Sequence, residues 1–173
     1  EHGAKMVLQI GHQGRAMPSF FSRLPLWAPS PIPCPATRET PHEMDLDEIQ
    51  EVVRCFVQTA ANVKASGMDG VELHAAHGYL VQAFLSPYSN RRSDRYGGSL
   101  ENRMRFLNEI VDAVRAEVGR DFLVGIRISA DELAPGGLTL DDMLDITQRL
   151  DATGKLDYFS VDAGTSAALS LII

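Results

Sequence analysis

The feature that most restricts the fold is a set of short segments that are nearly continuously apolar rather than alternating. Strands of a sheet with one solvent-facing side alternate apolar and polar residues, whereas parallel strands covered on both faces are continuously apolar. The second pattern holds in this chain, so we predict buried parallel strands. They are expected over Met6–Ile10, Gly70–His74, Phe122–Ile128 and Tyr158–Val161.

Amphipathic segments separate the later strands and predict three helices. Each begins after a residue that can cap a helix or within a run of acidic residues, and each has apolar residues on one face. Strands that alternate with helices in this way form a parallel sheet with helical crossovers. The helices are expected over Asp47–Ser66, from the cap Ser99 to Val118, and from the cap Thr139 to the region of Gly154.

Two α/β folds fit this order of elements, a barrel and a doubly wound sheet. A doubly wound dinucleotide fold carries the glycine motif G-x-G-x-x-G directly after a strand. No predicted strand is followed by that motif, and the glycines Gly11 and Gly14 have the wrong spacing. We therefore predict an α/β fold that forms part of a (β/α)8 TIM barrel.

Two long loops follow the carboxyl ends of predicted strands, over residues 11–46 and 77–98. The first is rich in proline and has no hydrophobic periodicity. Long loops inside a domain are usually functional, and in a TIM barrel the active site lies at the carboxyl ends of the strands. Both loops are therefore expected to border a site.

Both ends of the sequence look cut, and the expected unit is a single fragment, 1–173, incomplete at both ends. The first strand begins close to the N-terminus, and the chain stops on the apolar run Leu169–Ile173. A partial barrel has unpaired sheet edges and uncovered apolar faces, which promote association. We expect a homo-oligomer.

Charge and composition argue against several classes of function. The net charge is −7 with no basic tract, which argues against nucleic-acid binding. No apolar run approaches the roughly 20 residues that span a bilayer. Two cysteines, Cys34 and Cys55, make neither a disulfide framework nor a metal-binding repeat. By elimination, a cytoplasmic protein with a small-molecule substrate is expected.

The end of the second strand carries the densest set of reactive side chains, His74, His77 and Tyr79. If the turn there is helical, positions three apart share a face, and two imidazoles can donate to one oxygen atom beside a phenol. Structural histidines and a metal site are the alternatives. A metal needs a further ligand, and the nearest candidate, Glu72, is expected on the other side of the strand.

Two polar residues interrupt the apolar strands, Gln9 in the first and Arg127 in the third. A buried guanidinium requires a partner, and a buried amide must satisfy its donors and its acceptor. The structural interpretation pairs Arg127 with Glu72 or Asp162. The functional interpretation has Arg127 stabilise an anion that develops during a reaction, at the same edge as Gln9 and His74.

Four stretches together resemble the old yellow enzyme family, in the branch that contains bacterial ene-reductases, 2,4-dienoyl-CoA reductases and trimethylamine dehydrogenase. The resemblance extends from about residue 3 to residue 165, nearly the whole chain. The long stretch Asn90–Arg103 and the histidine-rich stretch Asp69–Leu80 are specific in combination. The stretches are Leu8–Arg15, Asp69–Leu80, Phe84–Pro87 and Asn90–Arg103.

This resemblance implies an FMN-binding TIM barrel of which the chain supplies approximately strands three to six. It implies that Gln9 pairs with the flavin pyrimidine edge and that Arg127 lies near flavin N1. His74 and His77 would bind the substrate carbonyl, with His74 also beside the cofactor, and Tyr79 would donate the proton. NADH or NADPH would reduce the flavin. No metal is expected at these residues, and an iron–sulfur cluster or FAD only in C-terminal regions outside the chain.

Four functions remain open on the sequence. The first is FMN-dependent reduction of α,β-unsaturated carbonyl compounds, either enones or dienoyl compounds. The second is FMN-dependent amine dehydrogenation or N-demethylation on the same scaffold, although His74 stands where amine-oxidising relatives tend to carry tyrosine. The third is metal-dependent hydrolysis through His74 and His77, and the fourth is a non-catalytic half-barrel that associates through its edges.

Overall fold

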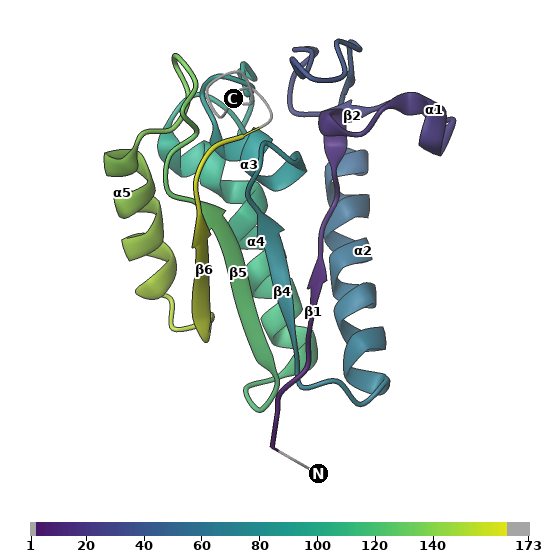
Figure 1. The fold of residues 1–173 in the computed structure, drawn as a ribbon, viewed down its shortest axis with the longest axis vertical. Helices are drawn as coiled ribbons and strands as arrows, with labels where there is room; N and C mark the ends of the chain where they lie inside the picture. Colours follow the sequence, from purple (N-terminus) through teal and green to yellow (C-terminus); the bar gives the residue numbers. More distant parts are fainter. Residues whose placement is uncertain (1–2, 166–173) are drawn as a thin grey trace.

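A parallel sheet forms the centre of the structure, and its four strands lie in the order β1-β4-β5-β6 (Figure 1). The computed structural model describes residues 3–165, so the apolar run 169–173 lies outside the described residues. All strand pairs of this sheet are parallel, as predicted, and the observed strand ends differ from the predicted ones by at most one residue. The strands are β1 (Val7–Ile10), β4 (Gly70–Ala75), β5 (Leu123–Ser129) and β6 (Tyr158–Asp162).

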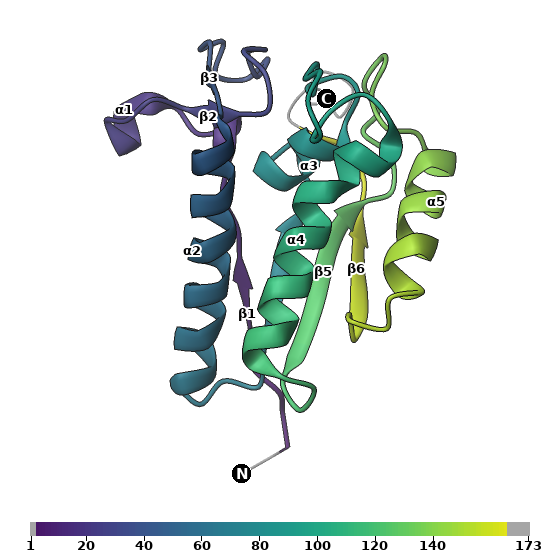
Figure 2. The same ribbon diagram turned by 180° about the vertical axis from the view of Figure 1, so that it is seen from behind.

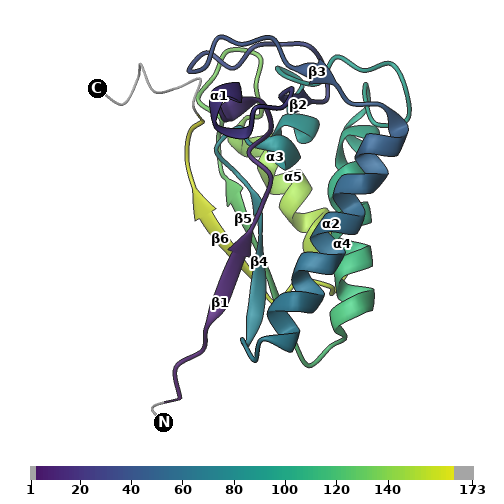
Figure 3. The ribbon, with the colours of Figure 1, turned by 90° about the vertical axis from the view of Figure 1, so that its right-hand side faces the viewer.

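The three long helices all cover the same face of this sheet. Figure 2 looks onto these helices, and the edge-on view in Figure 3 shows the strands on one side and the helices on the other. A doubly wound sheet has helices on both faces and a reversal of strand order. One-sided helices and sequential strands are the arrangement of consecutive βα units in a TIM barrel, which confirms the predicted fold class. The helices are α2 (Leu46–Ala65), α4 (Leu100–Val118) and α5 (Leu140–Asp151).

The strands divide their residues between the two faces of the sheet. On β4, Val71, Leu73 and Ala75 are buried among the helices. The intervening residues, Glu72 and His74, take the opposite face, because successive side chains in a strand point to opposite sides. Within the described residues no helix covers that second face (Figure 3). Packing and polar chemistry therefore lie on different faces of the same strands.

Side-chain caps fix where the helices begin. The Asp45 carboxylate accepts the Glu48 N–H and the Glu48 carboxylate accepts the Asp45 N–H, which is a capping box before α2. Ser99 and Thr139 cap α4 and α5, as the sequence predicted. The third helix ends at Asp151, slightly earlier than predicted. None of the helices within residues 3–165 is long and apolar enough to cross a membrane.

The two long loops contain short elements that hydrophobic periodicity did not reveal. The most important is α3, whose six residues are all buried and which lies inside the loop predicted over residues 77–98. Its apolar run is too short to show a helical period. The loops surround the carboxyl ends of the strands (Figure 1). The short elements are η1 (Gly14–Ala16), α1 (Ser19–Ser22), β2 (Trp27–Ala28), β3 (His42–Glu43) and α3 (Leu80–Leu85).

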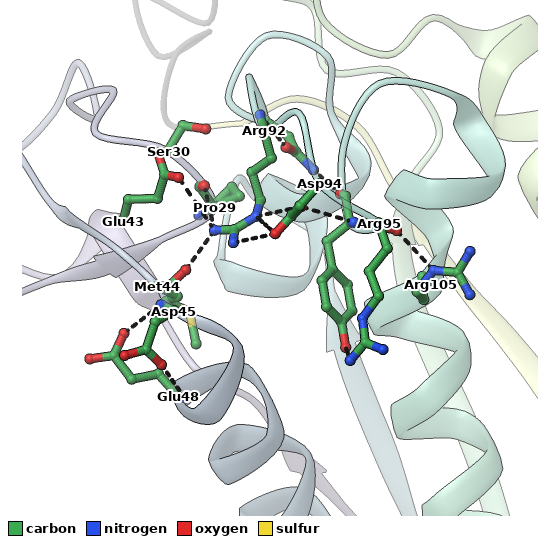
Figure 4. Close-up of polar contacts among 12 residues, drawn as sticks. Pro29, Ser30, Glu43, Met44, Asp45, Glu48, Arg92, Asp94, Arg95 and Arg105 are labelled. Carbon is green, nitrogen blue, oxygen red and sulfur yellow. Dashed lines mark hydrogen bonds and ion pairs between the residues drawn. The ribbon is translucent and has the colours of Figure 1, made fainter.

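The buried guanidinium of Arg92 joins the two loops (Figure 4). Its Nη1 donates to the carbonyl oxygens of Pro29, at 3.1 Å, and Met44, at 2.6 Å, both in the proline-rich segment. Its Nε and Nη2 donate to the Asp94 carboxylate, the latter at 2.7 Å. Arginine can satisfy backbone and carboxylate acceptors at once because its five donors form a fixed planar fork. Arg92 therefore fixes the proline-rich loop to the segment that precedes α4.

Candidate functional site

Side chains from four strands gather on the open face of the sheet, near the carboxyl ends of the strands. His74 of β4 pairs in register with Arg127 of β5. Gln9 of β1 is in register with Glu72, two residues before His74, so it lies on the same face. At the upper end, Ser129 of β5 is in register with Asp162 of β6. The structure thus places Gln9, His74 and Arg127 on one surface, as the sequence predicted.

The turn after β4 brings His77 and Tyr79 back toward His74. His77 has a φ of +61° and Gly78 a φ of +77°, both in the left-handed region, and Tyr79 is the N-cap of α3. The assumption that positions three apart share a helical turn was therefore wrong. Two successive left-handed residues reverse the chain, and the helix begins only at Leu80.

The three rings nevertheless lie in one cluster. Ring centroids are 5.1 Å apart for His74 and His77, 4.7 Å for His74 and Tyr79, and 5.9 Å for His77 and Tyr79. The His77 N–H donates to the Ser129 hydroxyl at 3.1 Å, which holds the turn against β5. Left-handed backbone is costly for a residue with a Cβ, so this contact helps to keep His77 in place.

A chain of hydrogen bonds sets the tautomers of both histidines. The Ala76 N–H donates to His74 Nδ1 at 3.2 Å, so the proton of a neutral His74 is on Nε2. His74 Nε2 lies 3.2 Å from His77 Nδ1. His77 Nε2 lies 2.7 Å from an Asp162 carboxylate oxygen, which can only accept. With both rings neutral, each histidine donates from Nε2, and the last proton points to Asp162.

Burial lowers the pKa of His74, and the neighbouring His77 and Arg127 lower it further. Desolvation and nearby cations both disfavour an imidazolium. The neutral ring is therefore the favoured form near pH 7. His74 then offers a single donor, Nε2–H, at the point where it faces His77 Nδ1.

Arg127 pairs with Asp162, one of the two partners that the structural interpretation named. Its Nε donates to the Asp162 carboxylate oxygen that also contacts His77, at 2.8 Å. Within the described residues its two terminal Nη groups make no hydrogen bond, and about a third of the side chain is exposed. Asp162 therefore orients Arg127 through one nitrogen and leaves two nitrogens able to bind an anion.

Glu72 does not lie where the sequence analysis placed it. It is two residues from His74 and so shares its face, because strand side chains alternate with a period of two. Its carboxylate accepts a hydrogen bond from Gln9 Nε2 at 2.7 Å. Glu72 therefore binds Gln9 at a position two residues before His74 along β4. Within residues 3–165, no group of three or more His, Cys, Asp or Glu residues is arranged to hold a metal ion.

An open cavity of about 400 Å³ adjoins the cluster. Gly11 is required at its wall, since a Cβ there would lie 2.7 Å from the Cβ of His74. Cavities with a few convergent polar groups are where small ligands bind. The residues that line it are Gln9, Gly11, Gln13, His74, His77 and Tyr79.

Sequence reasoning did not identify two members of the site. Asp162 was named only as a partner for Arg127, yet it also contacts His77 and accepts from the Ser129 hydroxyl at 2.8 Å. The available signal was an acidic residue directly after the apolar strand that begins at Tyr158, at the edge where His74 and Arg127 end. Gln13 had no comparable signal, because it lies in a loop without periodicity.

Consecutive βα units with polar side chains at the carboxyl ends of their strands define part of a TIM-barrel enzyme. Comparison with known families agrees with this class. The sequence model of the NADH:flavin oxidoreductase / NADH oxidase family matches residues 1–168. The chain belongs to this family, as its motifs predicted.

Similar proteins carry more than one type of name. The chain is 48% identical over 162 residues to an N,N-dimethylglycine/sarcosine dehydrogenase of Chromohalobacter salexigens, covering 93% of the chain and 23% of that protein. It is 45% identical over 164 residues to an NADPH dehydrogenase of Geobacillus sp., covering 95% of the chain and 46% of that protein. The chain therefore spans half or less of the length of these curated relatives.

Solved structures reproduce the fold closely. A 2-naphthoyl-CoA reductase in complex with 2-naphthoyl-CoA superposes with a TM-score of 0.89 at 34% identity. The match covers 94% of the chain and 27% of that protein. The βα units described above therefore recur, in the same arrangement, inside a longer enzyme.

Proposed function

We propose that the chain is the central part of an FMN-dependent oxidoreductase that reduces α,β-unsaturated carbonyl compounds with NADH or NADPH. The observation that carries this proposal is the cluster of His74, His77 and Tyr79 beside a cavity, with Gln9 and Arg127 on the same face. The family match and the low coverage of longer relatives support both the flavin and the partial barrel. A small-molecule substrate follows from the same proposal, whereas association of copies and a cytoplasmic location stay predictions.

The residues present fit an FMN ring. The Gln9 side chain can both donate and accept, which suits a pyrimidine edge that alternates carbonyl oxygens with an imide N–H. Arg127 offers two Nη groups that are unpaired within the described residues, and its fixed charge suits an anion near flavin N1. We assign Gln9 and Arg127 to the flavin and place His74 at its edge.

The chemistry then divides among the protein side chains. Reduced FMN, when bound, supplies the hydride that enters the β-carbon of the substrate. Negative charge grows on the carbonyl oxygen, and N–H donors from His74 and His77 stabilise it there. The Tyr79 hydroxyl protonates the adjacent α-carbon as general acid.

Asp162 has a specific part in this division of roles. The Asp162 carboxylate accepts from His77 Nε2 at 2.7 Å, which fixes the orientation of the ring and keeps its Nδ1 toward His74. The arrangement of the two imidazoles around a substrate oxygen therefore depends on Asp162.

The Asp162→Asn variant should reduce kcat/KM for an enone by roughly 10- to 100-fold, the range of a lost charge-assisted hydrogen bond. The amide replaces the charged acceptor that faces His77 Nε2 by a neutral one. Steady-state kinetics of the full-length enzyme give the ratio, and flavin fluorescence checks that Arg127 still supports FMN binding. Asp162→Glu is the matched control, because it keeps a carboxylate on the side chain that faces His77 and Arg127. An equal loss in both variants would contradict the role assigned to the charge.

A second candidate function is oxidation of a methylated amine on the same scaffold. The observation that favours it is the contact of His77 with Asp162, because a ring that donates from Nε2 presents Nδ1 as an acceptor for an N–H of the amine. The similarity to a dimethylglycine/sarcosine dehydrogenase points the same way. Reduction thus uses His77 as a donor to the substrate oxygen, whereas amine oxidation uses its Nδ1 as an acceptor.

Turnover of the full-length enzyme with each substrate class separates the two functions. We expect NADPH- or NADH-dependent reduction of a cyclic enone, and slower or no reduction of an electron acceptor by a methylated amine. An electron acceptor that needs no proton from Tyr79 serves as the control for flavin competence. Faster turnover with the amine would make the second function the correct one.

A further inference from the structure

A second row of polar residues crosses the open sheet face one level below the histidines. In the strand register Gln9 pairs with Glu72, Glu72 with Gly125, and Gly125 with Tyr158. One residue of each strand therefore lies at this level. We call Gln9, Glu72, Gly125 and Tyr158 the lower row.

Glu72 is the acceptor at the centre of the lower row. It accepts from Gln9 Nε2 at 2.7 Å on one side, and the Tyr158 hydroxyl is hydrogen-bonded to it from the other. Tyr158 reaches Glu72 across Gly125, because a Cβ at that glycine would lie 2.1 Å from the tyrosine ring. Burial and the charge of Glu72 raise the pKa of Tyr158 to about 12, so its hydroxyl stays protonated and donates. The absence of a side chain at Gly125 makes this arrangement possible.

The contact with Glu72 determines which way the Gln9 amide points. An ionised carboxylate has no proton to donate, so only the amide nitrogen of Gln9 can face it. The amide oxygen must then lie on the other branch of the planar group, away from Glu72. The remaining N–H and the oxygen of Gln9 are left for the cavity that Gln9 lines.

We propose that Glu72 is a positioning residue that fixes the orientation of the Gln9 amide, and with it the donor and acceptor pattern offered to the flavin pyrimidine edge. This inference rests on the proposed function, in which Gln9 binds FMN. It assigns to Glu72 a role that acts through Gln9 and needs no contact with the flavin.

The Glu72→Gln variant tests the inference, since it keeps the shape of the side chain and removes the charge. A glutamine both donates and accepts, so it no longer selects one orientation of Gln9. We expect the affinity of the full-length protein for FMN to fall about tenfold, the effect of one misplaced hydrogen bond. The flavin midpoint potential should become more positive, because a negative charge near the anionic reduced ring is gone.

A double-mutant cycle with Gln9→Ala gives the decisive measurement, with FMN binding followed by flavin fluorescence. If Glu72 acts through Gln9, then in the Gln9→Ala background Glu72→Gln should change the dissociation constant for FMN by less than about twofold. An equal loss with and without Gln9 would overturn the inference. If Gln9→Ala alone leaves FMN binding unchanged, the proposed contact between Gln9 and the flavin has failed instead.

Two more variants distinguish a changed orientation of the Gln9 amide from a loss of protein stability. Tyr158→Phe removes a hydrogen bond from Glu72 but keeps the carboxylate, so FMN affinity should change by less than about threefold; a tenfold loss would count against the inference. The thermal midpoint of the apoprotein reports folding in each variant. If Glu72→Gln does not fold, Glu72→Asp tests the same point, because its shorter side chain withdraws the carboxylate from Gln9. The double-mutant cycle with Gln9→Ala then applies to Glu72→Asp without change.

Discussion

Replacing Tyr79 with phenylalanine in the full-length enzyme should slow reduction of an enone by roughly 10²–10⁴-fold, the usual cost of a lost general acid. Reduction of the flavin by NADPH or NADH should stay within a few-fold of the wild-type rate. The substitution removes one hydroxyl and keeps the ring that lies 4.7 Å from His74. The cluster should therefore retain its packing while losing its proton donor.

The two half-reactions separate because only one of them needs a proton from the protein side chain. Hydride transfer from nicotinamide to flavin requires no acid at Tyr79, whereas saturation of the substrate double bond requires a proton at the α-carbon. Stopped-flow absorbance of the flavin measures each half-reaction independently. The histidines provide the comparison, since nicotinamide can use the same donors through its amide, and His74→Ala should weaken both steps.

Two outcomes would contradict the role of Tyr79. An unchanged rate of enone reduction in Tyr79→Phe would show that another group supplies the proton. Equal slowing of both half-reactions would show that the hydroxyl shapes the cavity rather than donating a proton. A general acid is supported if Tyr79→Phe slows reduction of the enone and leaves the rate of flavin reduction nearly unchanged.

Removing the carboxylate of Asp94 should destabilise the protein by about 3 kcal/mol, at the lower end of the cost of leaving a buried charge unpaired. Its partner, Arg92, has a side chain that is only 6% exposed, and Asp94 receives its Nε and Nη2 donors (Figure 4). Asp94→Ala leaves those two nitrogens without an acceptor. Asp94 is about a third exposed, and the Glu43 carboxylate remains 3.8 Å from Arg92 Nη1, so the loss should not reach the upper end of the range.

The pH dependence of this loss has a definite sign. The hydrogen bonds from Arg92 hold the pKa of Asp94 below its usual value, so the pair stabilises the native state above pH about 4. That contribution disappears as pH falls through the lowered pKa. The difference in thermal midpoint between wild type and Asp94→Ala should therefore be largest near pH 7 and narrow below pH 4.

The chain contains its own control for a surface ion pair. Asp145 and Arg149 lie four residues apart on α5, with both side chains about half exposed. Asp145→Ala should leave the thermal midpoint within experimental error, because exposed pairs contribute little. Equal destabilisation by both substitutions would show that burial of Arg92 is not what matters.

The parts of the fold that were predictable are those whose signal is local. The positions of the four strands, α2 and α4 follow from hydrophobic pattern and caps within the segment itself, and Ser99 and Thr139 were recognised as caps. Burial was predicted wrongly for β1 and β6, because Leu8 and Gln9 are exposed and no residue of β6 is buried. Helix α3 was missed because a run of six residues, five of them apolar, does not define a period. Its burial depends on packing against α4, which lies outside that run.

The sequence predicted that His74, His77 and Tyr79 lie together, but it did not predict Gln13, the contact of Asp162 with His77, or the hydrogen bonds that orient the cluster. His74, His77 and Tyr79 are close in sequence and meet in the structure. The contacts that orient them come from residues 52 to 85 positions away, through Ser129 and Asp162. The left-handed backbone of His77 is likewise supported by Ser129, and a pattern read within one segment cannot contain that information.

The division of each strand into two faces has a consequence for mutational tolerance. Substitutions at Val71, Leu73 or Ala75 act on packing among the helices, whereas those at Glu72 or His74 act on the opposite face and leave that packing intact. A complete substitution scan should show a period of two along β4, with abundance and activity lost at alternating positions. Single changes on the second face can therefore alter the groups that border the cavity while the apolar contacts among the helices are kept.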